Sequence, residues 1–443
     1  MSSRLPKFVI TAVLAAIFLG GVAGLLRKPN AAPPVPFVAI PTRLPAAQVF
    51  VDSPELIQVP AEIPPDFSER LRRSFNRSLV RADEGILTFR DAAALRRFLA
   101  RASAAGLEVR GQLDAVFAAR VRVTDYAAFS RELAAHAGDY SAISSNVVFS
   151  PPAPPAENRA ARDAIPVGNN LLAALGVKSP DPTWGRGVTI AVLDGGVPFD
   201  SSYGNRLRSL DIGYGLTGGG TDGAHAASVA ALAAGGSAEA RGVAPGASVL
   251  SLRVTGPDGT ADVFSISQGI YAAVDKGAQI INISLGGYAT SPLLTDAVNY
   301  ALAANVAIVA AAGNDQAAQL TWPAAYSGVV SVGAVDAVGK QAIFSNSGPQ
   351  LQLTAPGYAI ATAGAGGSRV SFSGTSASAP VASGAIAALL STTPGLNALQ
   401  AADLLAVYSD DHGPAGTDPD YGRGTLNLDR ALRREPAPQT AKP

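Results

Sequence analysis

One run of residues constrains the fold more than any other. Residues 188–193 are apolar apart from the β-branched Thr189, and Asp194, Gly195 and Gly196 follow them directly. A strand that is buried on both faces has such a continuous apolar run, whereas a strand with one face in water alternates. The run therefore predicts a parallel strand inside an open α/β sheet. Asp194 would then lie at the carboxyl end of that strand, where such sheets place their binding sites.

The same pattern recurs further along the chain. Apolar runs predict more strands, and amphipathic stretches between them predict helices. The strands are expected at 248–254, 280–284, 306–311 and 329–335, and the helices at 262–276 and 292–304. Strands that alternate with helices form a doubly wound sheet with helices on both faces. We therefore expect residues 169–432 to form one large α/β domain with a mainly parallel sheet.

A smaller unit precedes this sheet. Between residues 83 and 151 the hydrophobic pattern switches between strand and helix periods in the order βαββαβ, which predicts a small α+β domain. Its elements are expected at 85–90, 91–105, 107–116, 118–123, 125–137 and 142–149.

The first 28 residues predict export. Arg4 and Lys7 precede an apolar run at 8–26, and two further basic residues follow it. The run is long enough to cross a bilayer as a signal-anchor, and small residues at 21–23 would also suit a signal peptidase. Membrane anchoring and secretion both remain open. In either case we expect the folded part to lie on the extracytoplasmic side.

Three further segments are expected to connect or end the domains. Prolines recur from Pro29 to Pro65, and we expect an extended linker over residues 29–82. A second linker, 152–168, contains a polar stretch at 158–162 that a protease could cut. Residues 433–443 are short, polar and proline-bearing, which predicts a disordered tail.

Composition limits the partners and the chemistry. The 34 Lys and Arg residues balance 34 Asp and Glu residues, which removes the electrostatic case for nucleic acid as a partner. Cysteine is absent, so the chain has neither a disulfide, a thiolate metal site nor a cysteine nucleophile. We expect no cofactor and no metal. One loop gathers acidic residues that could form a cation loop but that we interpret as solvated turns: Asp410, Asp411, Asp418 and Asp420, with His412 among them.

Ser376 is the candidate nucleophile. It lies between Gly374 and an alanine-rich stretch, 377–390, that predicts a buried helix. Unpaired backbone N–H groups and the helix dipole favour negative charge on a reacting oxygen at a helix N-terminus. Serine also caps helices very often. This stretch alone therefore leaves helix capping open as the alternative.

Four motifs in one order resemble the subtilisin-like serine protease family, the subtilases. They are GVTIAVLDGG at 187–196, SLGG at 284–287, AGN at 312–314 and GTSASAP at 374–380. The resemblance covers residues 184–431 and implies a doubly wound fold and the hydrolysis of peptide bonds in peptide or protein substrates.

The resemblance also implies roles for single residues. Asp194 would be the triad acid, Ser376 the nucleophile and Asn314 the side-chain donor to the oxyanion. The residues that would pair with an extended substrate are Ser284, Leu285 and Gly286. Subtilases commonly carry a βαββαβ propeptide, which chaperones folding and lays its C-terminus in the active site. Residues 83–151 are similar to it, so this domain is an expected partner of the enzyme.

The chain departs from the family at the general base. The family has a histidine at the start of a helix, in a His-Gly-Thr-His pattern, where this chain has Asp222-Gly223-Ala224-His225. Alignment on the glycine puts Asp222 at the position of the base and His225 at a second, non-catalytic histidine. Moving His225 into the catalytic position would shift the helix by three residues, about 4.5 Å. The spacing from Asp194 permits either residue.

An aspartate at this position would change the chemistry. An ionised carboxylate is a weak base for a serine hydroxyl at neutral pH, and Asp194 nearby would raise its proton affinity. The sedolisin family, similar in fold, uses a glutamate there and works in acid. We therefore expect the hydrolysis to be reduced, acid-shifted or lost, unless His225 serves as an alternative base. The other interpretation is an inactive homologue that binds peptides as an extracytoplasmic scaffold.

Overall fold

The computed structural model describes residues 56–57, 59–60, 62–152, 164–212, 223–237 and 241–437. The chain divides into two compact units, 1–46 and 47–443, and every described residue belongs to the second. The apolar run at 8–26 lies outside the described residues. Within the described ranges, no helix is both long enough and apolar enough to cross a membrane.

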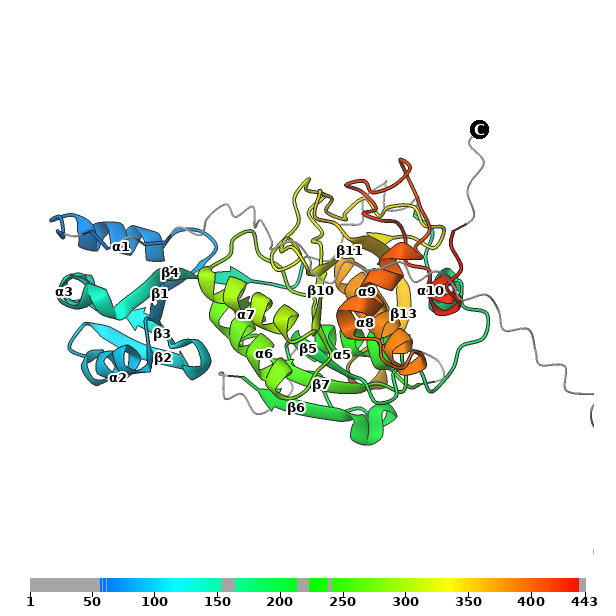
Figure 1. The fold of residues 1–443 in the computed structure, drawn as a ribbon, viewed down its shortest axis with the longest axis horizontal. Coiled ribbons are helices and arrows are strands. Elements are labelled where there is room, and N and C mark those ends of the chain that lie inside the picture. Colours follow the sequence, from blue (N-terminus) through cyan, green and yellow to red (C-terminus); the bar gives the residue numbers. More distant parts are fainter. Residues whose placement is uncertain are drawn as a thin grey trace, which may run out of the picture. The chain divides into compact units, whose positions relative to one another are not determined.

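A seven-stranded parallel sheet lies at the centre of the large domain (Figure 1). Its strand order is β12-β11-β10-β9-β5-β7-β6. The run that predicted a buried strand is β5, which pairs with β7 on one side and β9 on the other. The strands are β5 (Thr189–Asp194), β6 (Leu207–Asp211), β7 (Ser248–Arg253), β9 (Ile280–Ile283), β10 (Ala307–Ala311), β11 (Val330–Val335) and β12 (Leu353–Pro356).

Helices cover both faces of this sheet. Along β5, Ile190 and Val192 belong to one apolar core, and Ala191 and Leu193 belong to the other. Because successive side chains of a strand point to opposite faces, each face of the sheet has its own core. The first core contains α5 (Gly223–Ala234) and α8 (Thr375–Thr392), and the second contains α6 (Val263–Asp275) and α7 (Pro292–Ala303). The predicted doubly wound α/β fold is confirmed.

Shorter elements complete the large domain. An antiparallel pair, β13 and β14, lies next to α5 and carries Phe372 at its end. The helices α9 and α10 pack on α8 and extend the first core. These elements are α4 (Leu171–Ala174), β13 (Ile360–Ala363), β14 (Arg369–Phe372), α9 (Ala398–Val407) and α10 (Leu428–Arg433).

The small domain has the predicted βαββαβ order. Its antiparallel sheet has the order β2-β3-β1-β4-β8, and the last strand, β8 (Ala261–Asp262), comes from the large domain. The two domains therefore share one sheet. The elements of the small domain are β1 (Val80–Phe89), α2 (Ala92–Arg101), β2 (Leu107–Leu113), β3 (Ala118–Val123), α3 (Tyr126–His136) and β4 (Tyr140–Phe149).

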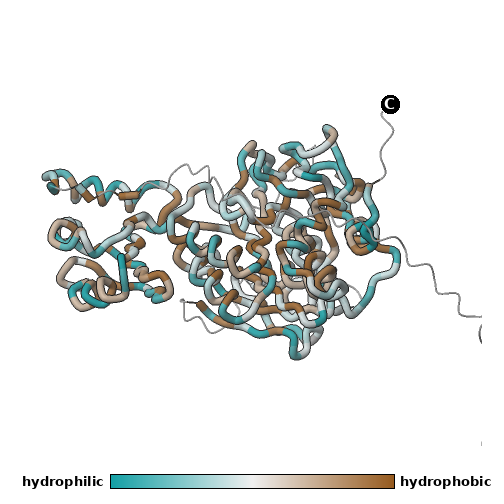
Figure 2. Tube along the Cα trace, in the orientation of Figure 1, coloured by the Kyte–Doolittle hydropathy of each residue, from teal (hydrophilic) through white to brown (hydrophobic). Residues whose placement is uncertain are grey.

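One helix of the small domain was not predicted. The helix α1 (Phe67–Phe75) falls within 29–82, where the prolines predicted an extended linker. Its buried residues, Phe67, Leu71 and Phe75, are four positions apart, and polar residues lie between them (Figure 2). This spacing is typical of an amphipathic helix. The prediction was wrong because the prolines end at Pro65, before the helix begins.

Candidate active site

Asp194 ends β5 at the carboxyl edge of the sheet and is only 2% exposed. Its Oδ1 accepts a hydrogen bond from the Gly195 N–H at 2.7 Å, and its Oδ2 lies 2.8 Å from His225 Nδ1. A carboxylate can only accept, so Nδ1 carries the proton of this bond. The second ring nitrogen, Nε2, is buried and has no hydrogen-bond partner among the described residues. Asp194 thus orients the imidazole and leaves Nε2 able to accept a proton.

His225 lies in the first turn of α5, which begins at Gly223. The helix start packs closely against the loop after β5, because a Cβ on Gly223 would lie 3.3 Å from the Gly196 carbonyl oxygen. Almost the whole of α5 beyond His225 is small, apolar and buried, which fixes the helix on the sheet. These contacts bring His225 to Asp194. Asp222, which the glycine alignment places at the base position, lies outside the described residues.

The surroundings of His225 set its pKa. Burial lowers the pKa of the imidazole, but the charge and the hydrogen bond of Asp194 raise it, and the net result lies above the usual value of 6.5. The ring of Phe372 stands edge-on to the imidazole, with ring centroids 5.4 Å apart. His225 is therefore a stronger base than a free histidine.

Ser376 is the second residue of α8 and is 2% exposed. Gly374 is the N-cap of this helix, so the alternative that Ser376 serves as the cap is wrong. The Ser376 hydroxyl donates to the carbonyl oxygen of Ser284 at 3.4 Å. Ser376 therefore lies at a helix start beside the end of β9, with its hydroxyl turned toward Ser284.

Pro380 explains a second bond between these two serines. Because proline has no N–H, the carbonyl of Ser376, four residues earlier, lacks its usual helical donor. The Ser284 hydroxyl donates to that carbonyl at 3.2 Å. Ser284 therefore contacts both the hydroxyl and the main chain of Ser376, which fixes the position of the candidate nucleophile.

Asn314 follows β10 and is oriented by the turn that begins α8. Its Oδ1 accepts hydrogen bonds from the N–H and the hydroxyl of Thr375, both at 2.9 Å. The Thr375 hydroxyl also accepts from the Gly313 N–H at 3.1 Å. The amide nitrogen of Asn314 lies over Gly374, where a Cβ would be 2.8 Å away. Glycine at 374 thus leaves room for a side-chain N–H donor beside Ser376.

The residues expected to pair with substrate differ in their burial and in their main-chain hydrogen bonds. Ser284 and Leu285 are fully buried, and the Leu285 side chain belongs to the core around α6 and α7. Gly286 pairs through its main chain with Ser150, which follows β4: the Ser150 N–H donates to the Gly286 carbonyl at 3.0 Å, and the Gly286 N–H donates back at 2.9 Å. The small domain thus contributes an extended strand at this edge.

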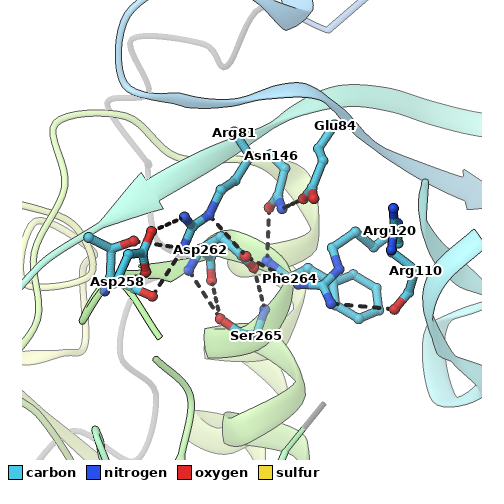
Figure 3. Close-up of polar contacts among 10 residues, drawn as sticks. Arg81, Glu84, Arg110, Arg120, Asn146, Asp258, Asp262, Phe264 and Ser265 are labelled. Atoms are coloured by element: carbon cyan, nitrogen blue, oxygen red, sulfur yellow. Dashed lines mark hydrogen bonds and ion pairs between the residues drawn. The ribbon is translucent and has the colours of Figure 1, made fainter. Parts of the chain in front are cut away.

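A charged cluster joins the two domains and was not predicted from the sequence (Figure 3). Arg81 lies 2.5 Å from Asp258 and also donates to the Thr260 carbonyl at 3.0 Å. Arg120 lies 3.2 Å from Asp262, which is 1% exposed. Burial raises the pKa of Asp258, but the hydrogen bonds from Arg81 and Thr260 hold it below its usual value.

Only part of this cluster had a signal in the sequence. Asp262 and Ser265 form a capping box at the start of α6, and their spacing alone could have predicted it. The two arginines lie more than 140 positions away from Asp262 along the chain, and no local pattern connects them.

The acidic loop near the C-terminus is held by protein partners. Asp410 pairs with Arg430 at 2.8 Å, and Asp418 accepts from the N–H groups of Asp420 and Tyr421. In the part of the chain that the structure describes, no three His, Asp or Glu side chains are grouped so that they could hold a metal ion.

Comparisons with known proteins find relatives of the large domain. The family model described as the subtilase family, Peptidase_S8, matches residues 185–424, more than half of the chain. Subtilisin BL from Lederbergia lenta is 34% identical over 252 residues, which are 56% of this chain and 92% of the relative. Subtilisin DY from Bacillus licheniformis is 35% identical over 196 residues, which are 43% of this chain and 70% of the relative.

Solved structures are similar as well. Fervidolysin from Fervidobacterium pennivorans, described as a keratinolytic enzyme related to subtilisin, matches with a TM-score of 0.68 and 24% identity. The match covers 82% of this chain and 63% of fervidolysin, and it concerns the fold. The protease domain of PatA matches with a TM-score of 0.52 and 29% identity, over 58% of this chain and 97% of that domain.

Proposed function

The chain belongs to the subtilase family, and from that premise we propose that it is a serine peptidase with Asp194, His225 and Ser376 as its triad. The observation that carries this proposal is the 2.8 Å contact between His225 Nδ1 and Asp194 Oδ2. An imidazole held in this way is a far better base at neutral pH than a carboxylate. The glycine alignment supports Asp222 instead, but it rests on sequence register alone.

The proposed reaction is ordinary acyl transfer to water. An extended substrate pairs with Gly286, and the Ser376 hydroxyl turns from Ser284 to His225. His225 Nε2 takes its proton as Oγ attacks the carbonyl carbon, and Asp194 stabilises the imidazolium. The amine leaves with that proton, and water then hydrolyses the ester on Ser376.

Two donors would hold the oxyanion of the tetrahedral intermediate. They are the Asn314 amide nitrogen and the Ser376 backbone N–H, which lies at the start of α8. Such a preorganised donor typically contributes about 3 kcal/mol to the stability of the transition state. Thr375 supports this role because it fixes the other end of the Asn314 amide.

The small domain is proposed as the propeptide of this enzyme. What supports this role is its place in the sequence before the large domain, the strand pairing of β4 with β8, and the two hydrogen bonds between Ser150 and Gly286. Export is proposed from the apolar run at 8–26, either with the run retained as a membrane anchor or with secretion after cleavage.

Labelling with a fluorophosphonate tests the assignment of the base. The full chain is first nicked with trypsin, for which Arg159 and Arg162 between the domains are sites, and is then labelled at pH 8. We expect labelling of the large domain to be lost in Ser376→Ala and to fall by about 1,000-fold in His225→Ala. The matched control, Asp222→Asn, should label like the parent.

The opposite labelling pattern would identify the Asp222 carboxylate as the base. Labelling that survives His225→Ala but is lost in Asp222→Asn would make Asp222 the base. A chain that is never labelled between pH 4 and 9, although it is folded, would be an inactive homologue that acts as a peptide-binding scaffold.

A further inference from the structure

The strand that follows β4 has a definite register on the substrate edge. Ser150 and Gly286 exchange both main-chain hydrogen bonds, which makes them a hydrogen-bonded antiparallel pair. In antiparallel pairing the next such pair lies two residues forward along one strand and two residues back along the other. Continued by two residues, this register would bring Pro152 opposite Ser284.

Ser284 is the neighbour of the nucleophile. Its carbonyl oxygen accepts the hydrogen bond from the Ser376 hydroxyl, and its own hydroxyl donates to the Ser376 carbonyl. A residue opposite Ser284 is therefore the one presented to Ser376. In a productive substrate strand, the N–H of that residue would donate to the Ser284 carbonyl, as the Ser150 N–H does to Gly286.

Proline cannot make this bond. It has no N–H, and its ring fixes φ near −65°, away from the values near −140° of an antiparallel strand. The Ser284 carbonyl is thus left without a donor from the strand, and the Ser376 hydroxyl donates to it at 3.4 Å. The nucleophile is then engaged away from His225 Nε2, which has no hydrogen-bond partner among the described residues.

Contacts upstream hold the strand in this register. Val148 and Phe149 pair with Asp262 and Ala261 of β8, and the Phe149 side chain is fully buried. The small domain is anchored on the same segment of the large domain, because Arg120 binds Asp262 (Figure 3). A slip by two residues would break these contacts together.

We propose that Pro152 makes this strand an inhibitor that the enzyme's own site does not cut. The chain then stays in one piece with its substrate edge occupied, until another protease cuts between the two domains. This inference rests on the proposed function of Ser376. It adds the register of the strand and the residue that prevents self-cleavage.

Replacing the proline should make the strand a substrate. In Pro152→Ala the new N–H can donate to the Ser284 carbonyl and release the Ser376 hydroxyl to His225. Oγ then attacks the carbonyl carbon of residue 152, the bond to the nitrogen of residue 153 breaks, and that amine leaves with the proton from His225. Water hydrolyses the resulting ester, which gives a carboxylate at residue 152 and restores Ser376.

The experiment follows self-cleavage of the full chain by intact mass and N-terminal sequencing. We expect Pro152→Ala to be cut after residue 152 about 100-fold faster than the parent chain, since misplacement of reacting groups by about 1 Å costs that much. The matched control is Pro151→Ala, because the nitrogen of residue 151 faces the opposite edge of the strand. It should stay intact, as should Pro152→Ala combined with Ser376→Ala.

Three results would overturn the inference. If the parent chain cuts itself after Pro152 as fast as the variant does, Pro152 does not prevent self-cleavage. A Pro152→Ala chain that stays intact, while its trypsin-nicked form is labelled by fluorophosphonate at Ser376, would leave the proposed function standing and refute the role of Pro152. If the nicked form is not labelled either, the proposed function fails and the inference fails with it.

Discussion

At the scale of single residues, the chemistry depends on which group Asp194 contacts. A carboxylate beside an imidazole raises the proton affinity of the ring and stabilises the imidazolium, whereas a carboxylate beside a second carboxylate only repels it. The contact with His225 therefore favours neutral-to-alkaline hydrolysis, and an Asp222 base would favour acid.

The pH dependence separates these two bases. The pKa of His225 lies above 6.5, and the base must be neutral to accept a proton, so activity should rise with pH through that pKa. We expect the acid limb of the kcat/KM profile of the trypsin-nicked enzyme above pH 6.5. Asp194→Asn removes the charge that raises the pKa and should move this limb to lower pH. Activity that increases toward acid in the parent enzyme would contradict the assignment.

Asn314 can be tested through kcat alone. Asn314→Ala removes one of the two proposed oxyanion donors, and such a donor acts on the transition state and hardly on the bound substrate. We expect kcat of the nicked enzyme to fall by about 100- to 1,000-fold with KM nearly unchanged. A change confined to KM would instead make Asn314 a substrate-binding residue.

At the scale of elements, one carbonyl group at the start of α8 lacks its helical hydrogen bond and receives one from the adjacent strand. Pro380 leaves the Ser376 carbonyl without a helical donor, and the Ser284 hydroxyl supplies one from β9. The helix and the sheet are thereby joined at the residue that must be positioned most accurately.

A double-mutant cycle measures this junction. Ser284→Ala leaves a buried carbonyl unpaired and should lower the free energy of unfolding by about 1–3 kcal/mol. Pro380→Ala restores an N–H at the same carbonyl, so the double variant should recover part of that loss, with a coupling of at least about 0.5 kcal/mol. Denaturant unfolding of the full chain provides both values. Strictly additive effects would show that the two residues do not serve the same carbonyl.

At the scale of the whole molecule, the two described domains are joined by a shared sheet and by charge pairs of unequal burial. Asp262 is 1% exposed and is paired with Arg120, whose side chain is 9% exposed. The side chain of Asp258, opposite Arg81, is 51% exposed. Breaking a buried pair leaves an uncompensated charge, whereas an exposed pair is screened by water and salt.

The domain interface should therefore respond unequally to two substitutions. In the trypsin-nicked protein, Arg120→Ala should speed the dissociation of the small domain by more than tenfold, because the buried Asp262 carboxylate loses its nearer partner and keeps Arg81 at 3.6 Å. The matched variant Asp258→Ala should change it by less than about tenfold. Size-exclusion chromatography at a series of times gives both rates. Equal effects would show that Asp262 is solvated in the complex.

Local patterns in the sequence predicted the fold class, and its motifs supplied the candidate site residues. The run that became β5, four of the strands parallel to it (β7, β9, β10 and β11) and the βαββαβ order follow from local periodicity. Burial on two faces or on one leaves a pattern that does not depend on distant residues. The strands β6 and β12 were not predicted. The roles proposed for Asp194, Asn314 and Ser376 come instead from the resemblance of their motifs to those of the subtilases. The amphipathic spacing in α1 was also local, and the prolines that precede the helix obscured it.

The contacts between side chains that are distant in the sequence depended on the folded structure. Local patterns fix elements to within a few residues, but a hydrogen bond requires a placement within a few tenths of an ångström. The packing of α5 against the loop after β5 therefore decided that His225 contacts Asp194. The same holds for Arg120, which lies more than 100 positions away from Asp262 and is brought near it by the fold alone.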